Sequence, residues 1–176
     1  MSKNIDENII KGLQLVADFI VSELRKEFEA QGHNDTNTLT NSLEGVVEKT
    51  TNGYVISVLG VGYAKYLETG FGKGKWVSVY ALMEWIERRG IETGEKEIKS
   101  AAFAIRRAIH DQGSPTNGAF SPKITSNGRR KEFITIVLDE NAIIIFDKVA
   151  EVFATMTEGV ITNAITVNKK YFENAQ

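Results

Sequence analysis

The glycine-rich segment Gly70–Trp76 holds the residues that most suggest chemistry. Lys73 and Lys75 alternate with glycines there, as in loops that surround a phosphate group. A P-loop needs a glycine five residues before its Gly-Lys pair and a Ser or Thr after the lysine, but Thr69 and Trp76 occupy these positions. The dinucleotide-binding fingerprint also fails, because Lys75 stands where its third glycine belongs. The segment therefore predicts a flexible turn.

The other ionisable side chains show no catalytic or metal-binding pattern. The chain has no cysteine and two histidines, His33 and His110, without an acidic cluster at ligand spacing beside them. Glu84 and Glu87 share a helix face, but their neighbour Arg88 indicates a charged surface exposed to water. We therefore expect a protein that is not an enzyme and uses no cofactor, metal ion or small-molecule substrate.

The composition predicts one globular domain over residues 1–176. Hydrophobic residues make up 42% of the chain and charged residues 25%, which is the balance of an ordinary folded domain. No segment approaches the roughly 20 apolar residues that a bilayer span requires. Residues 1–8 lack a signal-peptide core. We expect a protein made and kept in a cytoplasm, with no membrane partner.

Hydrophobic periodicity predicts four helices. Apolar residues recur at intervals of three or four over residues 4–30, 77–89 and 95–111. A long C-terminal helix is predicted over residues 142–164, and its apolar spacing is close to 3.5. That spacing suits packing against another helix, in this chain or in a partner.

The remaining ordered segments predict a small sheet. Residues 43–70 hold two β-rich runs around Thr51-Asn52-Gly53, and Asn-Gly is a strong hairpin signal. Residues 63–69 are expected to be a third extended piece or a short loop, and residues 133–138 a strand. The predicted fold class is α+β: a small antiparallel sheet packed by an N-terminal helix, two middle helices and a long C-terminal helix. Residues 113–130, with both prolines, are predicted to form a long loop.

Charge is distributed unevenly along the chain. Residues 88–131 carry ten basic and four acidic side chains, whereas the first thirty residues carry four basic and six acidic ones. Residues 139–176 carry three basic and six acidic side chains. A basic middle and acidic ends allow copies of the chain to dock on one another. The basic part also suits nucleic acid, and the third alternative is charge that serves only solubility.

Two segments resemble a known family. Thr-Leu-Thr-Asn-Ser-Leu at 38–43, then a hairpin, then Tyr-Ala-Lys-Tyr-Leu-Glu-Thr-Gly at 63–70 resemble the head–tail connector (neck, or tail-completion) proteins of tailed bacteriophages. Family members often have Thr-Gly-x-Leu-x-x-Ser-Ile, a variable hairpin and Tyr-Ala-x-Tyr-Val-Glu-x-Gly-Thr. The resemblance covers roughly residues 5–90. Asn37 or Thr38 replaces the family's first glycine, and residues 94–131 are longer than in the family.

The resemblance implies a non-enzymatic virion protein, made in the host cytoplasm, that forms a ring between portal and tail. Its implied partners are its own copies, the portal or adjacent neck and tail proteins, and packaged DNA in passive contact. Closed rings use head-to-tail contacts between subunits. We expect charge reversal at Glu68 to disturb assembly more than folding. The expected subunit-interface residues are Tyr63, Tyr66, Glu68, Phe71, Phe120 and Ile124.

The second hypothesis is a nucleic-acid-binding module that uses the basic region 88–131. Binding of single strands needs interleaved aromatic residues, and duplex binding needs a groove-reading helix. Only Phe120 and Phe133 lie near in sequence, so this hypothesis ranks second. The residues that would contact nucleic acid or an acidic partner are Arg106, Arg107, Arg129, Arg130 and Lys131.

Overall fold

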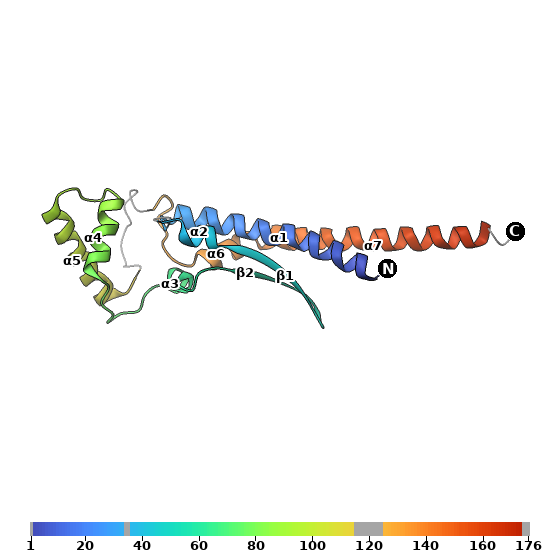
Figure 1. Ribbon diagram of the computed structural model, residues 1–176, viewed down its shortest axis with the longest axis horizontal. Helices are drawn as coiled ribbons and strands as arrows, with labels where there is room; N and C mark the ends of the chain where they lie inside the picture. Colours follow the sequence, from blue (N-terminus) through green and yellow to red (C-terminus); the bar gives the residue numbers. More distant parts are fainter. Residues whose placement is uncertain (1, 34–35, 115–124, 174–176) are drawn as a thin grey trace. The chain divides into compact units, whose positions relative to one another are not determined.

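The computed structural model describes residues 2–33, 36–114 and 125–173 (Figure 1). In these ranges the chain forms seven helices and one two-stranded antiparallel sheet, which confirms the predicted α+β class. The residues group into two compact units. The hairpin unit comprises Met1–Val21, Glu44–Val58 and Glu140–Gln176, and the helical unit comprises Ser22–Leu43 and Leu59–Asp139. The expectation of one domain over the whole chain stays a prediction.

Nine helices and strands lie in the residues that the structure describes. In chain order they are α1 (Ser2–Ala30), α2 (Thr38–Ser42), β1 (Glu44–Thr50), β2 (Gly53–Leu59), α3 (Ala64–Thr69), α4 (Val79–Arg88), α5 (Glu95–Gln112), α6 (Phe133–Glu140) and α7 (Ala142–Glu173). The four helices predicted from periodicity correspond to α1, α4, α5 and α7, and the predicted hairpin to β1 and β2. These elements carry strong local signals, which explains why the sequence predicts them.

Two segments predicted to be extended or irregular are helical. Residues 133–138, expected as a strand, lie in α6, and residues 63–69, expected as an extended piece or loop, lie mostly in α3. Phe133 and Val137, four residues apart, are both buried, so one helix face points inward. The β-branched run Ile-Thr-Ile-Val suits a strand by propensity, but packing overrides propensity here. The sheet therefore ends at Leu59 instead of extending to residue 70.

In the hairpin unit, α1 packs against α7 and against the hairpin. Gly12 permits the close approach of α7, because a Cβ atom at this position would lie 2.7 Å from the side chain of Val152. Gly45 of β1 meets Ala17 in the same way, at 2.8 Å. The amide of Gln14 donates a hydrogen bond of 2.8 Å to the Gly45 carbonyl. Small residues thus set the spacing between these elements.

A polar contact joins the β-hairpin to the start of α1. The Tyr54 hydroxyl donates a 2.6 Å hydrogen bond to the carboxylate of Asp6, and the Lys49 ammonium pairs with the other carboxylate oxygen. The hydrogen bonds from Lys49 and Tyr54 lower the pKa of Asp6 below its usual value. These contacts join the hairpin to the first turns of α1.

In the helical unit, one buried cluster lies at the end of α1. Phe28 is 1% exposed and Phe133 is fully buried, and their rings meet edge to face with centroids 5.8 Å apart. Arg25 donates from Nε to the Thr40 carbonyl at 3.0 Å and from Nη2 to the Leu43 carbonyl at 2.8 Å. These bonds satisfy carbonyls at the end of α2 that the helix itself leaves unpaired.

A second buried cluster joins α4 and α5. Ile86 of α4 and Ile98 and Ala102 of α5 form its centre. Ser78 caps the start of α4, since its hydroxyl accepts a hydrogen bond from the Ala81 amide. The two middle helices form a helical hairpin, joined by a short turn at residues 89–94.

Candidate assembly interface

Three of the predicted interface residues lie together. Tyr63 and Tyr66, at the start of α3, are 42% and 44% exposed. The Tyr66 ring meets the half-buried ring of Phe71 edge-on, with centroids 5.9 Å apart. Phe120 and Ile124 lie outside the described residues. The structure thus brings Tyr63, Tyr66 and Phe71 to one exposed region, and their role at a subunit junction stays a prediction.

Glu68, the fourth predicted interface residue in this segment, contacts its own chain. Its carboxylate accepts hydrogen bonds from the Ile134 amide at 2.8 Å, the Thr135 amide at 3.2 Å and the Thr135 hydroxyl at 2.6 Å. The Glu132 amide donates to the Glu68 carbonyl at 2.9 Å. Negative charge is favourable at a helix N-terminus, so Glu68 caps α6. Reversing its charge is therefore expected to lower the stability of the helical unit itself.

The predicted basic residues on α5 have different surroundings. The Arg106 guanidinium carbon lies 4.7 Å from the centre of the Trp76 ring. Arg107 is largely exposed and pairs with Asp111 at 3.6 Å. The two arginines are consecutive in α5, and among the described contacts Arg106 is the one that packs on an aromatic ring.

The predicted basic residues after the loop lie on the end of α1. Arg129 Nη1 is 3.8 Å from a Glu27 carboxylate oxygen, and the Lys131 carbonyl accepts a 3.0 Å hydrogen bond from Gln31. Nearby, the buried Thr125 donates from its hydroxyl to the Ala30 carbonyl. The described end of the predicted loop therefore packs on its own chain.

Arg130 is part of a half-buried cationic cluster with His33 and Arg89. His33 Nε2 donates a 3.0 Å hydrogen bond to the Arg130 carbonyl, and Arg130 Nη2 lies 3.4 Å from His33 Nδ1. Arg89 donates from Nη2 to the Gly32 carbonyl. The His33 ring also packs on Phe28, with centroids 5.3 Å apart. These contacts connect the end of α4, the end of α1 and the segment before α6.

Burial changes the acid–base properties of this cluster. It lowers the pKa of His33 to about 4 and that of Arg130 to about 10, and the charge of the neighbouring arginine acts in the same direction on each. His33 is therefore neutral at pH 7, and its Nδ1 is an acceptor for Arg130. Arg130 thus has a structural role beyond the predicted contact with an acidic partner. The sequence did not reveal this cluster, because His33 and Arg130 are distant in the chain.

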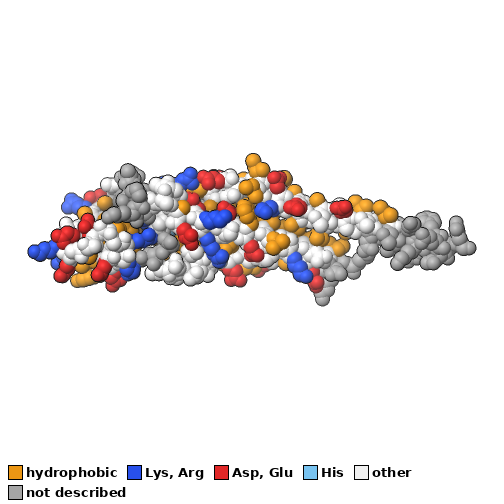
Figure 2. Space-filling model, turned by 90° about the horizontal axis from the view of Figure 1, so that it is seen from above, with side chains coloured by type: hydrophobic (Ala, Val, Ile, Leu, Met, Phe, Trp, Pro, Cys, Tyr) orange, Lys and Arg blue, Asp and Glu red, His pale blue; other side chains and the backbone are white. Residues whose placement is uncertain are grey.

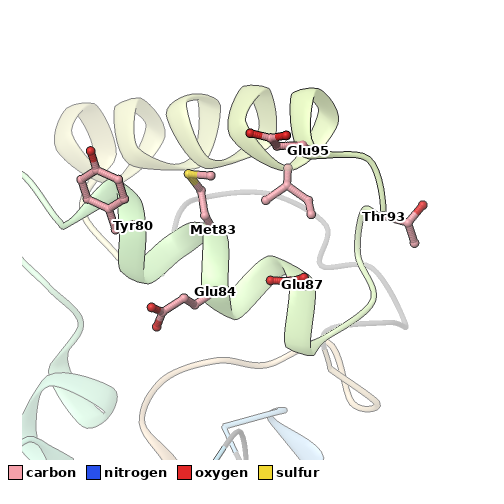
Figure 3. A pocket seen from close by; sticks show the side chains of 7 residues that line it. Tyr80, Met83, Glu84, Glu87, Thr93 and Glu95 are labelled. Carbon is pink, nitrogen blue, oxygen red and sulfur yellow. The ribbon is translucent and has the colours of Figure 1, made fainter.

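The acidic residues of α4 line a shallow pocket of about 300 Å³ between α4 and α5. Figure 3 shows the carboxylates of Glu84, Glu87 and Glu95 lying apart, without a common point toward which they converge. Glu84 pairs with Arg88 at 3.6 Å. This geometry agrees with the expectation of a charged surface exposed to water. Among the described residues, no group of His, Cys, Asp and Glu is arranged to hold a metal ion.

The most extended apolar surface in the hairpin unit belongs to α7. Ile143 is 78% exposed and Phe146 is 72% exposed, and further large apolar side chains follow along the same helix. They are Phe153, Val160, Ile161 and Ile165. At 100° per residue these positions fall on one stripe. Figure 2 shows such exposed hydrophobic side chains among charged ones along the part of the molecule where α7 lies.

The predicted C-terminal helix seam divides in the structure. Val149 and Met156 are half-buried, whereas Phe146, Phe153 and Val160 are exposed. Val152 and Met156 line a groove of about 280 Å³ beside Gly12 and Leu15 of α1. The 3.5 spacing therefore combined two faces, one that packs on α1 and one that faces solvent. We call the exposed face, formed by Ile143, Phe146, Phe153, Val160, Ile161 and Ile165, the α7 stripe.

In the part of the chain that the structure describes, no helix has the length and apolar character needed to cross a membrane. Comparisons with protein-family models, with curated proteins and with solved structures find no match to this chain.

Proposed function

We propose that the protein is a structural subunit that assembles into a ring in the head–tail connector of a tailed bacteriophage and joins the portal to the tail. The observation that carries this proposal is the α7 stripe. Monomeric proteins rarely keep a large contiguous apolar patch in water, and such patches mark interaction sites. An assembling subunit has a reason to keep one.

The size of the stripe suits a contact between protein chains. From Ile143 to Ile165 it extends along about 33 Å of helix, at about 1.5 Å per residue. Burying one large apolar side chain contributes about 1.5–3 kcal/mol. Six such side chains therefore provide enough favourable free energy to offset a substantial part of the cost of association.

The charges of the two units support head-to-tail contacts between copies. The hairpin unit holds ten acidic and six basic residues, whereas the helical unit holds fifteen basic and thirteen acidic ones. Opposite net charges within one chain favour a heterologous contact between one copy and the next. Heterologous contacts that close produce rings. The resemblance of residues 38–43 and 63–70 to connector proteins supports the location of such a ring between the portal and the tail.

The test uses Phe146→Glu, which introduces a charge into the stripe. Sedimentation velocity is measured on the protein alone and with purified portal, and incorporation into particles is quantified. We expect the wild type to be monomeric or weakly associated alone and to form a ring on the portal. Phe146→Glu should lose ring formation without a lower melting temperature, because Phe146 is largely exposed.

Asn8→Glu is the matched control. It adds the same charge at an exposed polar position of α1 and should assemble like the wild type. Equal incorporation of Phe146→Glu and Asn8→Glu, with unchanged melting of both, would reject the stripe as an assembly surface.

A further inference from the structure

We propose that Tyr66, Phe71 and Trp76, together with Lys65, Lys75 and Arg106, form a binding surface for single-stranded nucleic acid. We call these six residues the aromatic–basic surface. This inference goes beyond the proposed assembly function and uses different residues. All six belong to the helical unit.

The surface pairs each aromatic ring with a cation. Lys65 Nζ lies 5.0 Å from the centre of the Tyr66 ring, and Lys75 Nζ lies 5.5 Å from that of Phe71. The Arg106 guanidinium carbon lies 4.7 Å from the Trp76 ring. These distances are within the range of cation–π contacts. Positive charge is therefore held next to each exposed or half-buried ring.

The backbone brings these residues together from separate stretches of the chain. Phe71 pairs with Ser114 in an antiparallel bridge, and the Gly74 amide donates a 2.8 Å hydrogen bond to the His110 carbonyl. Gly113 makes the bridge possible, because it has φ 84° and a Cβ atom there would lie 2.7 Å from the Phe71 carbonyl oxygen. Residues 71–76 are thus fixed along the C-terminal end of α5.

Two ring contacts complete the surface. Trp76 stacks on His110 with centroids 3.9 Å apart and an interplanar angle of 17°, and Tyr66 meets Phe71 edge-on. Despite these contacts Trp76 remains 56% exposed. The indole is therefore held in a fixed orientation while part of its surface stays open to a ligand.

The charges around these rings suit a polyanion. Lys73 and Arg107, both exposed, add to the three cations of the surface. Among the described contacts, the carboxylate beside these cations is that of Asp111. It pairs with Arg107 at 3.6 Å and with His110 at 2.8 Å. Glu68, on α3, directs its carboxylate to the start of α6 instead. Positive charge therefore exceeds negative charge here.

Interleaved aromatic rings and cations match the chemistry of a single strand. Unpaired bases stack on aromatic side chains, and lysine and arginine meet the phosphates. A duplex hides the faces of its bases, so its binding would depend on the phosphates alone. The exposed Trp76 and Tyr66 rings favour the single strand for this reason.

The sequence does not predict this surface, because only Phe120 and Phe133 lie near the basic residues 106–131 in the chain. The structure supplies aromatic rings from residues 66–76 instead. The Gly70–Trp76 segment, which fails as a phosphate-binding loop by sequence, is the turn that positions Lys75 and Trp76 beside Arg106.

The experiment measures binding of a fluorescein-labelled 15-nucleotide oligothymidylate by anisotropy, with a 15-base-pair duplex as comparison. In parallel, Trp85→Phe leaves Trp76 as the only tryptophan, so that stacking on it is observed as quenching of its emission. We expect the single strand to bind more tightly than the duplex and to quench Trp76. For single strands, log K should fall with log salt by about 0.7 per phosphate neutralised.

Variants separate stacking from charge. Trp76→Leu should weaken binding about tenfold or more, and Trp76→Phe should retain most of it, because a ring remains. Arg106→Gln should weaken binding and reduce the salt slope. Tyr80→Leu and Lys96→Gln are controls at exposed positions outside the surface and should bind like the wild type. Thermal melting of each variant confirms that it is folded.

Three outcomes would overturn the proposal. One is absence of binding and quenching at low salt. Another is equal affinity for single strand and duplex with Trp76→Leu unaffected, which would leave only nonspecific charge attraction. In the third, oligothymidylate does not bind the wild type, and a folded Trp76→Leu variant loses binding to the portal. The surface would then be a protein interface. Because the assembly test depends on Phe146, failure of one proposal is distinguishable from failure of the other.

Discussion

Phe133 and Phe146 are the same residue type in consecutive helices, but their surroundings are opposite. Phe133 in the helical unit is fully buried against Phe28, whereas Phe146 in the hairpin unit is 72% exposed. The helical unit also directs polar side chains such as Glu68 and Arg25 to its own helix ends. In the hairpin unit one face of α7 is largely exposed, and of its residues Phe153 meets the Tyr54 ring with centroids 6.4 Å apart. Large apolar side chains are thus buried inside the helical unit, whereas several on α7 of the hairpin unit remain in water.

The largest expected difference in the free energy of unfolding is between variants at these two phenylalanines. Phe133→Ala should lower the free energy of unfolding by about 3–5 kcal/mol, because it removes a fully buried ring. Phe146→Ala should change it by within about 0.5 kcal/mol, because the side chain is exposed. Urea denaturation monitored by circular dichroism measures both. A similar loss for both variants would mean that α7 is covered within its own chain.

The His33 cluster predicts that the helical unit loses stability in acid. The folded-state pKa of His33, about 4, is below the ordinary 6.5. Between pH 6.5 and 4 the unfolded state binds a proton that the folded state does not, so stability falls as pH falls through this window. The total loss is about 3 kcal/mol.

His33→Gln tests this pH dependence, since glutamine keeps hydrogen-bonding atoms but does not titrate. Unfolding free energies are measured from pH 7 to pH 4 for wild type and variant. The variant should show a smaller fall in stability over this range. An identical fall would assign the acid sensitivity to other groups.

The cap on α6 predicts a smaller effect. Glu68→Ala should lower the free energy of unfolding by about 1–2 kcal/mol, because three donors at the start of α6 lose their acceptor. Glu84→Ala is the control, since its ion pair with Arg88 is exposed and should matter by less than about 0.5 kcal/mol. If the two variants melt alike, Glu68 does not stabilise α6.

The smallest expected effects concern two glycines in the helices of the hairpin unit. A Cβ atom at Gly12 would lie 2.7 Å from Val152, whereas one at Gly159 would have nothing within 4 Å. Gly159→Ala should stabilise by up to about 1 kcal/mol through helix propensity. Gly12→Ala should destabilise by about 1 kcal/mol, because the overpacking exceeds the same gain. Thermal melting of both variants checks the sign; stabilisation by both would mean that α1 and α7 are less closely packed.

The elements with strong local signals are predictable from the sequence alone. The spacing of apolar residues predicted α1, α4, α5 and α7, and Asn52-Gly53 predicted the hairpin, because both signals depend on residues close in the chain. The expectation that Tyr63, Tyr66, Glu68 and Phe71 lie at a subunit junction came from the resemblance and stays a prediction. Residues 133–138 are different, because their β-branched run is helical where Phe133 is buried and Glu68 caps the start of the helix, and both contacts come from distant parts of the chain.

The tertiary structure also decided which residues form surfaces. Several pairs of contacting residues are far apart in the chain, so no local pattern predicts that they meet. These pairs are Glu68 with Ile134, His33 with Arg130, and Trp76 with Arg106. The same reason explains why the seam of α7 was not divided in advance into a packed and an exposed face. Periodicity shows that a helix has an apolar side, but only the position of its neighbours determines which apolar residues remain in water.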